Sequence, residues 1–176
     1  MNGHISDRFR HTAAATLLAL GLAAAVLPTS TTAADTRLSL EAIAARALDL
    51  HPGETLEVER ERKRGRDVYD VEILDAARDT VWKLRFDAVS GELLKEEAEP
   101  AHDHARRLRQ EGSIVALATV ADAAQRVRAG ELLEVELKHR RGHYIYEVEI
   151  LDERGQVWEL KFDARDGNFL EEEADD

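Results

Sequence analysis

Residues 56–75 read LEVERERKRGRDVYDVEILD, and residues 133–152 read LEVELKHRRGHYIYEVEILD. A second matching pair follows, with VWKLRFDAVSGELLKEEA at 81–98 and VWELKFDARDGNFLEEEA at 157–174. Roughly half of the aligned positions are identical, and the register slips by one residue in the loop between the paired stretches. Because a loop tolerates an insertion better than a strand or helix does, the sequence predicts a duplicated folding unit.

Within each copy the hydrophobic spacing changes from a helical period to a strand period. After Ser39, a suitable N-cap, apolar residues recur every three or four positions until His51, and residues 117–125 repeat this pattern. From Leu56 onward apolar and charged residues alternate, as in antiparallel strands with one wet face. The sequence therefore predicts an α+β fold of two tandem repeats, each with one helix packed on a three- to four-stranded antiparallel sheet.

The first 34 residues have the pattern of a secretory signal peptide. Arg8 and Arg10 precede an uncharged, Ala/Leu-rich run at 12–27, and small residues lead to Ala34. The apolar run is short for a bilayer span, so we expect cleavage after Ala34 and no stable membrane insertion afterwards. The mature protein would be periplasmic or secreted. The expected organisation is a signal peptide at 1–34, a first unit at 35–99, a charged linker at 100–112 and a second unit at 113–176.

Composition limits the classes of partner. The net charge is −12, and cleavage after Ala34 would remove one acid and two bases, giving −13. An excess of this size argues against nucleic acid as a ligand. The chain has no cysteine, which excludes both disulfides and attachment to a lipid through an acylated cysteine. Stability must therefore come from packing.

The repeated unit resembles the PepSY domain. The resemblance rests on an Ala-rich helix containing Glu41-Ala42-Ile43, on Tyr69-Asp70-Val71-Glu72, and on Asp87-Ala88-Val89-Ser90-Gly91 followed by Glu92-Leu93-Leu94. In the second copy the matching segments are Tyr146-Glu147-Val148-Glu149 and Asp163-Ala164-Arg165-Asp166-Gly167, whereas Ala118-Thr119-Val120 departs from the helix pattern. The resemblance implies a non-catalytic α+β domain that binds proteins and restrains or chaperones secreted peptidases.

An Asp and a Gly close the third predicted strand of each copy. Asp87 precedes Gly91, and Asp163 precedes Gly167, at the same spacing. This spacing suits a tight turn in which the carboxylate accepts backbone N–H groups and the glycine takes positive φ. A weak calcium site, helped by Asp166, is the alternative, but the loop offers fewer oxygens than calcium requires. We therefore favour a structural turn.

Aromatic residues recur at equivalent strand positions. Trp82 and Trp158 share a face with core residues in the period-two pattern, so we expect core packing rather than ligand stacking. The same interpretation applies to Tyr69 and Tyr146, with their hydroxyls expected at the sheet edge.

Acidic residues dominate the wet faces of both predicted sheets. In the first repeat, Lys83 and Arg85 can offset their neighbours Glu57, Glu59, Asp70 and Glu72. In the second repeat the balance fails, because only Lys161 offsets Glu134, Glu136, Glu147, Glu149 and Glu159. Exposed like charges are tolerated without any function. Alternatively, these five glutamates bind a cationic surface on a partner.

The remaining candidate sites are few. His102-Asp103-His104 resembles a metal-binding fragment but lacks the third and fourth ligands of a zinc site, so we expect no metal and no cofactor. The sequence contains no phosphate-binding loop, cysteine nucleophile or Gly-x-Ser-x-Gly motif, and we interpret the chain as a non-enzyme. The first hypothesis is an exported protein-binding module that inhibits or chaperones a secreted peptidase. The alternative is a periplasmic sensor or scaffold that binds cations or cationic peptides and signals to an envelope sensor.

Overall fold

The structure is a computed structural model that describes residues 37–101, 107–108 and 112–175. In the first repeat, helix α1 (Leu40–Leu50) is followed by strands β1 (Glu54–Lys63), β2 (Arg66–Asp75), β3 (Thr80–Asp87) and β4 (Leu93–Pro100). In the second repeat, helix α3 (Leu117–Val127) is followed by strands β5 (Glu131–Arg140), β6 (His143–Leu151), β7 (Val157–Asp163) and β8 (Phe169–Ala174). The predicted signal peptide and His102-Asp103-His104 lie outside the described residues. No helix in the described ranges is long and apolar enough to cross a bilayer.

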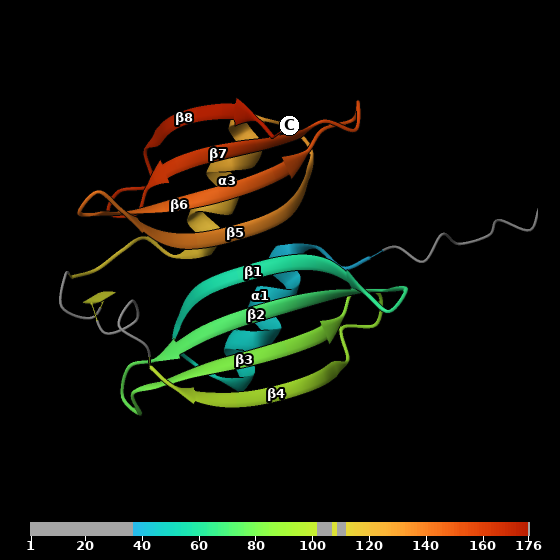
Figure 1. Cartoon of the computed structure of the whole chain (residues 1–176), viewed down its shortest axis with the longest axis vertical. Coiled ribbons are helices and arrows are strands. Elements are labelled where there is room, and N and C mark those ends of the chain that lie inside the picture. Colours follow the sequence, from blue (N-terminus) through green and yellow to red (C-terminus); the bar gives the residue numbers. More distant parts are fainter. Residues whose placement is uncertain (1–36, 102–106, 109–111, 176) are drawn as a thin grey trace, which may run out of the picture. The chain divides into compact units, whose positions relative to one another are not determined.

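The strands form one antiparallel sheet rather than two. Their order is β4-β3-β2-β1-β5-β6-β7-β8, so the first strands of the two repeats are neighbours at its centre (Figure 1). The predicted α+β class and antiparallel pairing are confirmed, but the expectation of one sheet for each repeat is not. The physical reason is that β1 and β5 would each be an exposed edge in a separate sheet, and their pairing satisfies both edges.

The junction between β1 and β5 is short. Their pairing runs from Glu57 to Glu59 on β1 and from Glu134 to Glu136 on β5, with Val58 opposite Val135 at its centre. Both valines are fully buried. Further contacts between the repeats come from Glu131 of β5, which binds Arg60 of β1 and Arg37.

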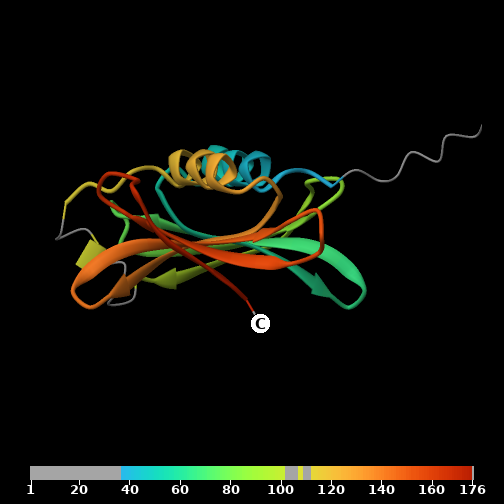
Figure 2. The ribbon, with the colours of Figure 1, turned by 90° about the horizontal axis from the view of Figure 1, so that it is seen from above.

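Both helices cover the same face of the sheet (Figure 2). Helix α1 buries Leu40, Ile43, Ala44 and Ala47, and α3 buries Leu117, Val120, Ala121 and Ala124. Apolar residues at this spacing form the stripe that an amphipathic helix lays on a core. Ser39 caps α1 by accepting a hydrogen bond from Ala42 N at 3.3 Å, whereas Ala116, at the same position before α3, makes no side-chain cap. Neither α1 nor α3 lies on the opposite face of the sheet (Figure 2).

Each repeat has a β-bulge where its first strand begins. Pairing shifts between Thr55 and Glu57 in β1, and between Leu132 and Glu134 in β5. The bulge interrupts the alternation of buried and exposed positions, so that Leu132 and Val135, three residues apart, are both buried.

The segment between the repeats is not uniformly solvated. Strand β4 continues to Pro100, one residue beyond the expected unit boundary. Ala101 and Leu108 are buried and belong to the core. Apolar side chains in the charged segment therefore help to cover the sheet.

Candidate functional site

The two family tyrosines fix the chain where it enters each helix. Tyr69 and Tyr146 are fully buried, and their hydroxyls donate to the carbonyl oxygens of Leu38 at 3.0 Å and Val115 at 2.9 Å. The expectation that these hydroxyls lie at the sheet edge was wrong. The period-two pattern placed the rings on the helix-covered face but contained no signal for the partner of the hydroxyl.

Each tryptophan lies between the core and a pair of charged or ionisable side chains. Trp82 is partly buried and stacks on His51 with ring centroids 3.8 Å apart. Nε2 of His51 lies 3.2 Å from Oε1 of Glu96 on the edge strand β4. His51 follows the end of helix α1 and Glu96 lies on an edge strand, so Trp82 packs against a contact that joins the two. This arrangement indicates a structural role for the tryptophan.

In the second repeat an arginine takes the place of His51. The guanidinium of Arg128 lies 3.6 Å from the centre of a Trp158 ring and binds Glu172 on β8 at 3.1 Å. Nε1 of Trp158 also donates to Oδ2 of Asp152 at 3.0 Å. In the first repeat Asp75 instead pairs with Arg78, and Nε1 of Trp82 has no hydrogen-bond partner among the described residues. Sequence reasoning missed these partners, although His51 and Arg128 occupy matching positions.

The Asp-Gly segments form tight turns. Oδ1 of Asp87 accepts hydrogen bonds from Val89 N at 3.0 Å and Ser90 N at 2.9 Å, and Gly91 has φ of 69°. In the second repeat Asp163 accepts from Arg165 N at 2.8 Å, and Gly167 has φ of 72°. The backbone hydrogen bond from Ser90 is the main cause that lowers the pKa of Asp87. The Asp87 carboxylate therefore stabilises the turn by accepting these hydrogen bonds.

Three of the five glutamates proposed as a partner-binding surface already have cationic partners: Glu136, Glu147 and Glu159. Glu147 is buried and binds Lys138 at 2.8 Å and Arg140 at 3.1 Å. Burial raises the pKa of Glu147, but the hydrogen bonds from Lys138 and Arg140 outweigh burial and hold it below its usual value. Glu159 binds Lys161 at 2.9 Å. The expected imbalance was therefore overestimated, because Lys138 and Arg140 on β5 were not counted against the acids of β6.

Glu134 and Glu136 lie opposite acids of the first repeat. Glu136 lies opposite Glu57, and Glu134 lies opposite Glu59, across the β1–β5 pairing. Glu149 is paired with Glu134 across β5 and β6. We call this group, made of Glu57, Glu59, Glu134, Glu136 and Glu149, the acidic seam. Sequence reasoning placed the acidic surface in the second repeat alone, because it did not foresee the pairing of β1 with β5.

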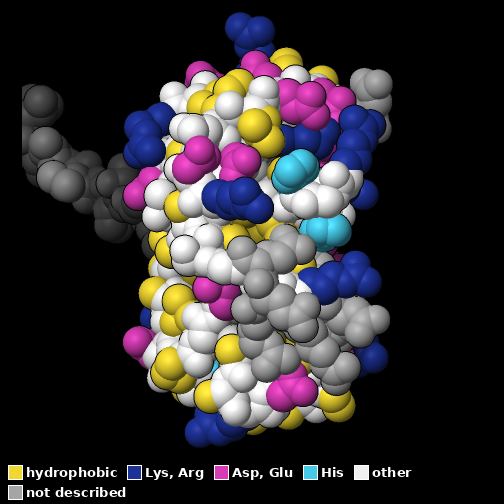
Figure 3. All heavy atoms as spheres, turned by 90° about the vertical axis from the view of Figure 1, so that its left-hand side faces the viewer, with side chains coloured by type: hydrophobic (Ala, Val, Ile, Leu, Met, Phe, Trp, Pro, Cys, Tyr) yellow, Lys and Arg dark blue, Asp and Glu magenta, His cyan; other side chains and the backbone are white. Residues whose placement is uncertain are grey.

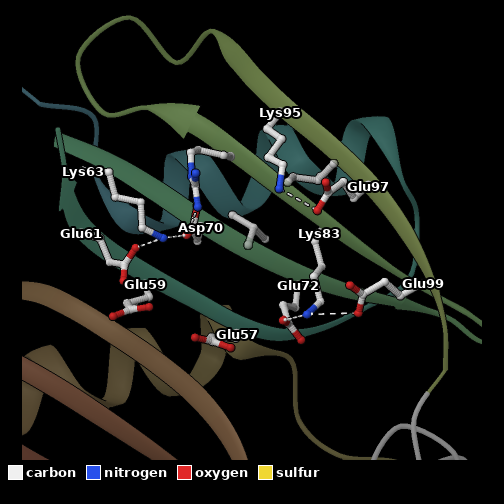
Figure 4. Close-up of a pocket in the computed structure, with 13 residues that line it drawn as sticks. Glu57, Glu59, Glu61, Lys63, Asp70, Glu72, Lys83, Lys95, Glu97 and Glu99 are labelled. Atoms are coloured by element: carbon white, nitrogen blue, oxygen red, sulfur yellow. Dashed lines mark hydrogen bonds and ion pairs between the residues drawn. The ribbon is translucent and has the colours of Figure 1, made fainter. Parts of the chain in front are cut away.

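Most carboxylates of the acidic seam lack a cation. Glu136 binds Lys138 at 2.8 Å, but none of the other four makes an ion pair with the described part of the chain. In Figure 4, dashed lines join Lys63 to Glu61, Lys83 to both Glu72 and Glu99, and Lys95 to Glu97, whereas none joins Glu57 or Glu59 to a lysine. On the side of the molecule seen in Figure 3, by contrast, lysine and arginine side chains lie among the acidic ones.

Burial and repulsion between carboxylates change the protonation of the seam. Burial, followed by the charges of Glu72 and Glu136, raises the pKa of Glu57 to about 7. Burial, a hydrogen bond with Glu136 and the charge of Glu149 raise the pKa of Glu134 to about 8. The pKa values of Glu59 and Glu149 are also raised, chiefly by burial. Within the described ranges, no group of three or more histidine, aspartate or glutamate side chains is arranged so that it could hold a metal ion. Chemically, the seam is suited to accept hydrogen bonds from cationic side chains.

Comparison with known proteins agrees with the repeated architecture. The family model for PepSY, described as the peptidase propeptide and YPEB domain, matches residues 37–97 and 114–173. The chain belongs to the PepSY family. The predicted tandem pair of PepSY domains is thereby confirmed.

One protein is similar to this chain in sequence, and two solved structures are similar to it in fold. The uncharacterised protein YkoJ of Bacillus subtilis (strain 168) is 28% identical over 147 residues, which cover 84% of this chain and 79% of YkoJ. The CD1622 protein of Clostridium difficile 630 superposes with a TM-score of 0.45 and 20% identity, covering 77% of this chain and 91% of that one. The YpmB protein of Bacillus subtilis gives a TM-score of 0.35 and 20% identity, covering 77% and 96% of the two chains.

Proposed function

We propose that this PepSY protein is an exported, non-catalytic module that binds a cationic surface of another protein through the acidic seam. The observation that carries the proposal is the direct opposition of Glu57 to Glu136 and of Glu59 to Glu134 at the junction of the repeats. Like charges opposite each other destabilise a strand pair. A lysine or arginine placed between them relieves that repulsion, so binding gains free energy that the isolated protein lacks.

A secreted peptidase is the first candidate partner. The description of the family names peptidase propeptides, and the N-terminal sequence has the pattern of an export signal. The protein would inhibit or chaperone the peptidase in trans. Strands β4 and β8 are the edges of the sheet and offer a second means of contact through their backbone groups.

A sensor or scaffold for cationic peptides is the second candidate function. The raised pKa values of Glu57 and Glu134 favour this function, because the charge of the seam then varies near neutral pH. Binding of a cation would change the protonation of these two glutamates. In this case the protein would bind basic peptides without slowing any peptidase.

Zero-length crosslinking separates these functions. A carbodiimide joins a carboxylate to a lysine only where the two are in contact, so the mature protein can be treated together with the exported proteins of its own cell. We expect amide links from Glu57 or Glu134 to lysines of one partner, and their loss in a Glu57→Gln/Glu134→Gln variant. If that partner is a peptidase, its activity should fall when the protein is added. Links found only on Glu171 and Glu173, at the edge of the sheet, would contradict binding at the seam.

A further inference from the structure

A hollow of about 840 Å³ at the β1–β2 turn of the first repeat is lined by cations. Its basic side chains are Lys63, Arg64, Arg66, Arg85 and Lys95, and its apolar part is made by Val68 and Leu94. No acidic side chain from the described residues lines it. The lining of this hollow is therefore positively charged, although the net charge of the chain is −12.

Neighbouring acids neutralise only part of this charge. Lys63 and Arg85 share the carboxylate of Asp70, and Lys63 also binds Glu61. Arg66 lies 3.8 Å from Asp87, whose other oxygen already accepts backbone hydrogen bonds of the turn. Arg64 makes no hydrogen bond or ion pair within the part of the chain that the structure describes. Two exposed guanidinium groups, on Arg64 and Arg66, are therefore available to a ligand.

Lys95 lies on the opposite side of the hollow. It binds Glu97 at 2.7 Å, and both side chains are half exposed. An exposed pair of this kind contributes little stability, so a ligand can displace it at small cost.

The second repeat provides an internal comparison. Its matching hollow, of about 720 Å³, is lined by Arg140, Arg141, His143, Lys161 and Glu171 at the positions of the five cations. Histidine replaces Arg66 and glutamate replaces Lys95, and four more acids line this hollow: Glu147, Glu159, Asp163 and Glu173. The fold of the repeat is the same in both copies, so it does not require the concentration of cations in the first.

We propose that the hollow of the first repeat binds an acidic segment of a partner protein. Its carboxylates pair with Arg64 and Arg66, because a guanidinium offers two parallel donors to one carboxylate. An apolar side chain of the segment packs on the exposed side chain of Leu94, a contact that a free inorganic anion cannot make. Leu94 and Lys95 belong to the edge strand β4, so the backbone of the segment can also pair with that edge.

The acidic seam does not prevent binding of an acidic ligand here. Glu59 and Arg64 are five residues apart on the chain, which corresponds to roughly 16 Å along an extended strand. Charges interact weakly beyond a Debye length, which is about 8 Å at physiological salt. Lys63, Arg85 and Lys95 also line a second hollow that contains Glu57 and Glu59 (Figure 4), whereas Arg64 and Arg66 do not. The two sites therefore adjoin but take ligands of opposite charge, and this inference does not rest on the proposed function.

The test uses a short capped peptide of alternating glutamate and leucine, labelled with a fluorophore and followed by anisotropy. We expect saturable binding at one site, weakened at least about tenfold in an Arg64→Ala/Arg66→Ala variant because charge-assisted hydrogen bonds are lost. Both arginines are exposed, so the variant should keep its fold, which its thermal unfolding checks. The matched control is Arg141→Ala/His143→Ala at the equivalent exposed positions, which should bind as the unaltered protein does.

A gain of function makes the test stricter. The change His143→Arg/Glu171→Lys gives the second hollow the two cations that the first one has, and should add a second binding site. The Glu57→Gln/Glu134→Gln variant should bind the acidic peptide unchanged, which keeps the result independent of the seam. Absence of saturable binding, or equal affinity in the Arg64→Ala/Arg66→Ala variant, would overturn the proposal. Equal competition by inorganic phosphate would also overturn it, because the apolar contact would then contribute nothing.

Discussion

Glu57 of the first repeat lies directly opposite Glu136 of the second, in the strand pairing that joins the two PepSY domains. The next pair along the junction, Val58 and Val135, is fully buried. The junction therefore combines a favourable apolar contact on one face of the sheet with repulsion between carboxylates on the other. Its stability must depend on the charge of those carboxylates.

The first prediction concerns pH. Because the pKa values of Glu57 and Glu134 are raised to about 7 and about 8, the folded protein binds protons that the unfolded chain releases above its ordinary glutamate pKa of 4.5. Between about pH 4.5 and about pH 8 the folded state therefore holds more protons, and its stability falls as the pH rises. Carboxylates whose pKa is lowered, such as Asp70 and Asp87, titrate below this window.

The measurement is the thermal midpoint of unfolding across that pH window. We expect the midpoint to fall by a few degrees from the acidic to the alkaline end, and the Glu57→Gln/Glu134→Gln variant to show a flatter profile. The same slope in the variant would show that the seam does not control it.

The second prediction concerns the tryptophans. Trp158→Ala should destabilise the protein by about 3–5 kcal/mol, as expected for loss of a large aromatic side chain packed on a core. Trp82→Ala should cost less, because Trp82 has no hydrogen bond comparable with that from Trp158 to Asp152. Urea unfolding of both variants gives the comparison. A Trp82→Ala variant with unaltered stability would argue instead for a ligand-stacking role.

The third prediction concerns the turn glycines. Gly91 and Gly167 both have positive φ, so alanine at either position costs about 1 kcal/mol in backbone strain. A Cβ atom on Gly91 would also lie 2.7 Å from Cδ1 of Leu38, whereas on Gly167 its nearest neighbour would be Val115 at 3.6 Å. Gly91→Ala should therefore be more destabilising than Gly167→Ala. Equal thermal midpoints would show that Leu38 moves aside without cost.

Local features of this fold follow directly from the sequence, whereas its central pairing does not. The period-two pattern around Tyr69 and Trp82 predicted strands and their buried face, and the Asp87–Gly91 spacing predicted a turn. Nothing in the pattern of β1 or β5 indicates which edge pairs with which, because alternation describes faces and not neighbours. Sequence reasoning therefore placed the acidic surface in one repeat and missed its continuation across Glu57 and Glu59.

The cationic partners of the predicted glutamates were missed for a related reason. Lys138 lies on the same strand as Glu136 and also reaches Glu147 on the neighbouring strand. A count of charges along the predicted strands does not identify such diagonal contacts, since they depend on side-chain direction and on register. The hollow of the first repeat was missed because its cations come from four strands and a turn.

Calorimetric titration of the mature protein with a short lysine-rich peptide tests the binding role of the acidic seam most directly. The account predicts saturable binding that weakens at least about tenfold when two seam glutamates lose their charge in Glu57→Gln/Glu134→Gln. The control Glu171→Gln/Glu173→Gln removes at least as much negative charge, at the edge strand β8, and should leave the affinity nearly unchanged. Absence of saturation, or equal weakening in both variants, would contradict the account, because binding would then depend on net charge and not on the seam.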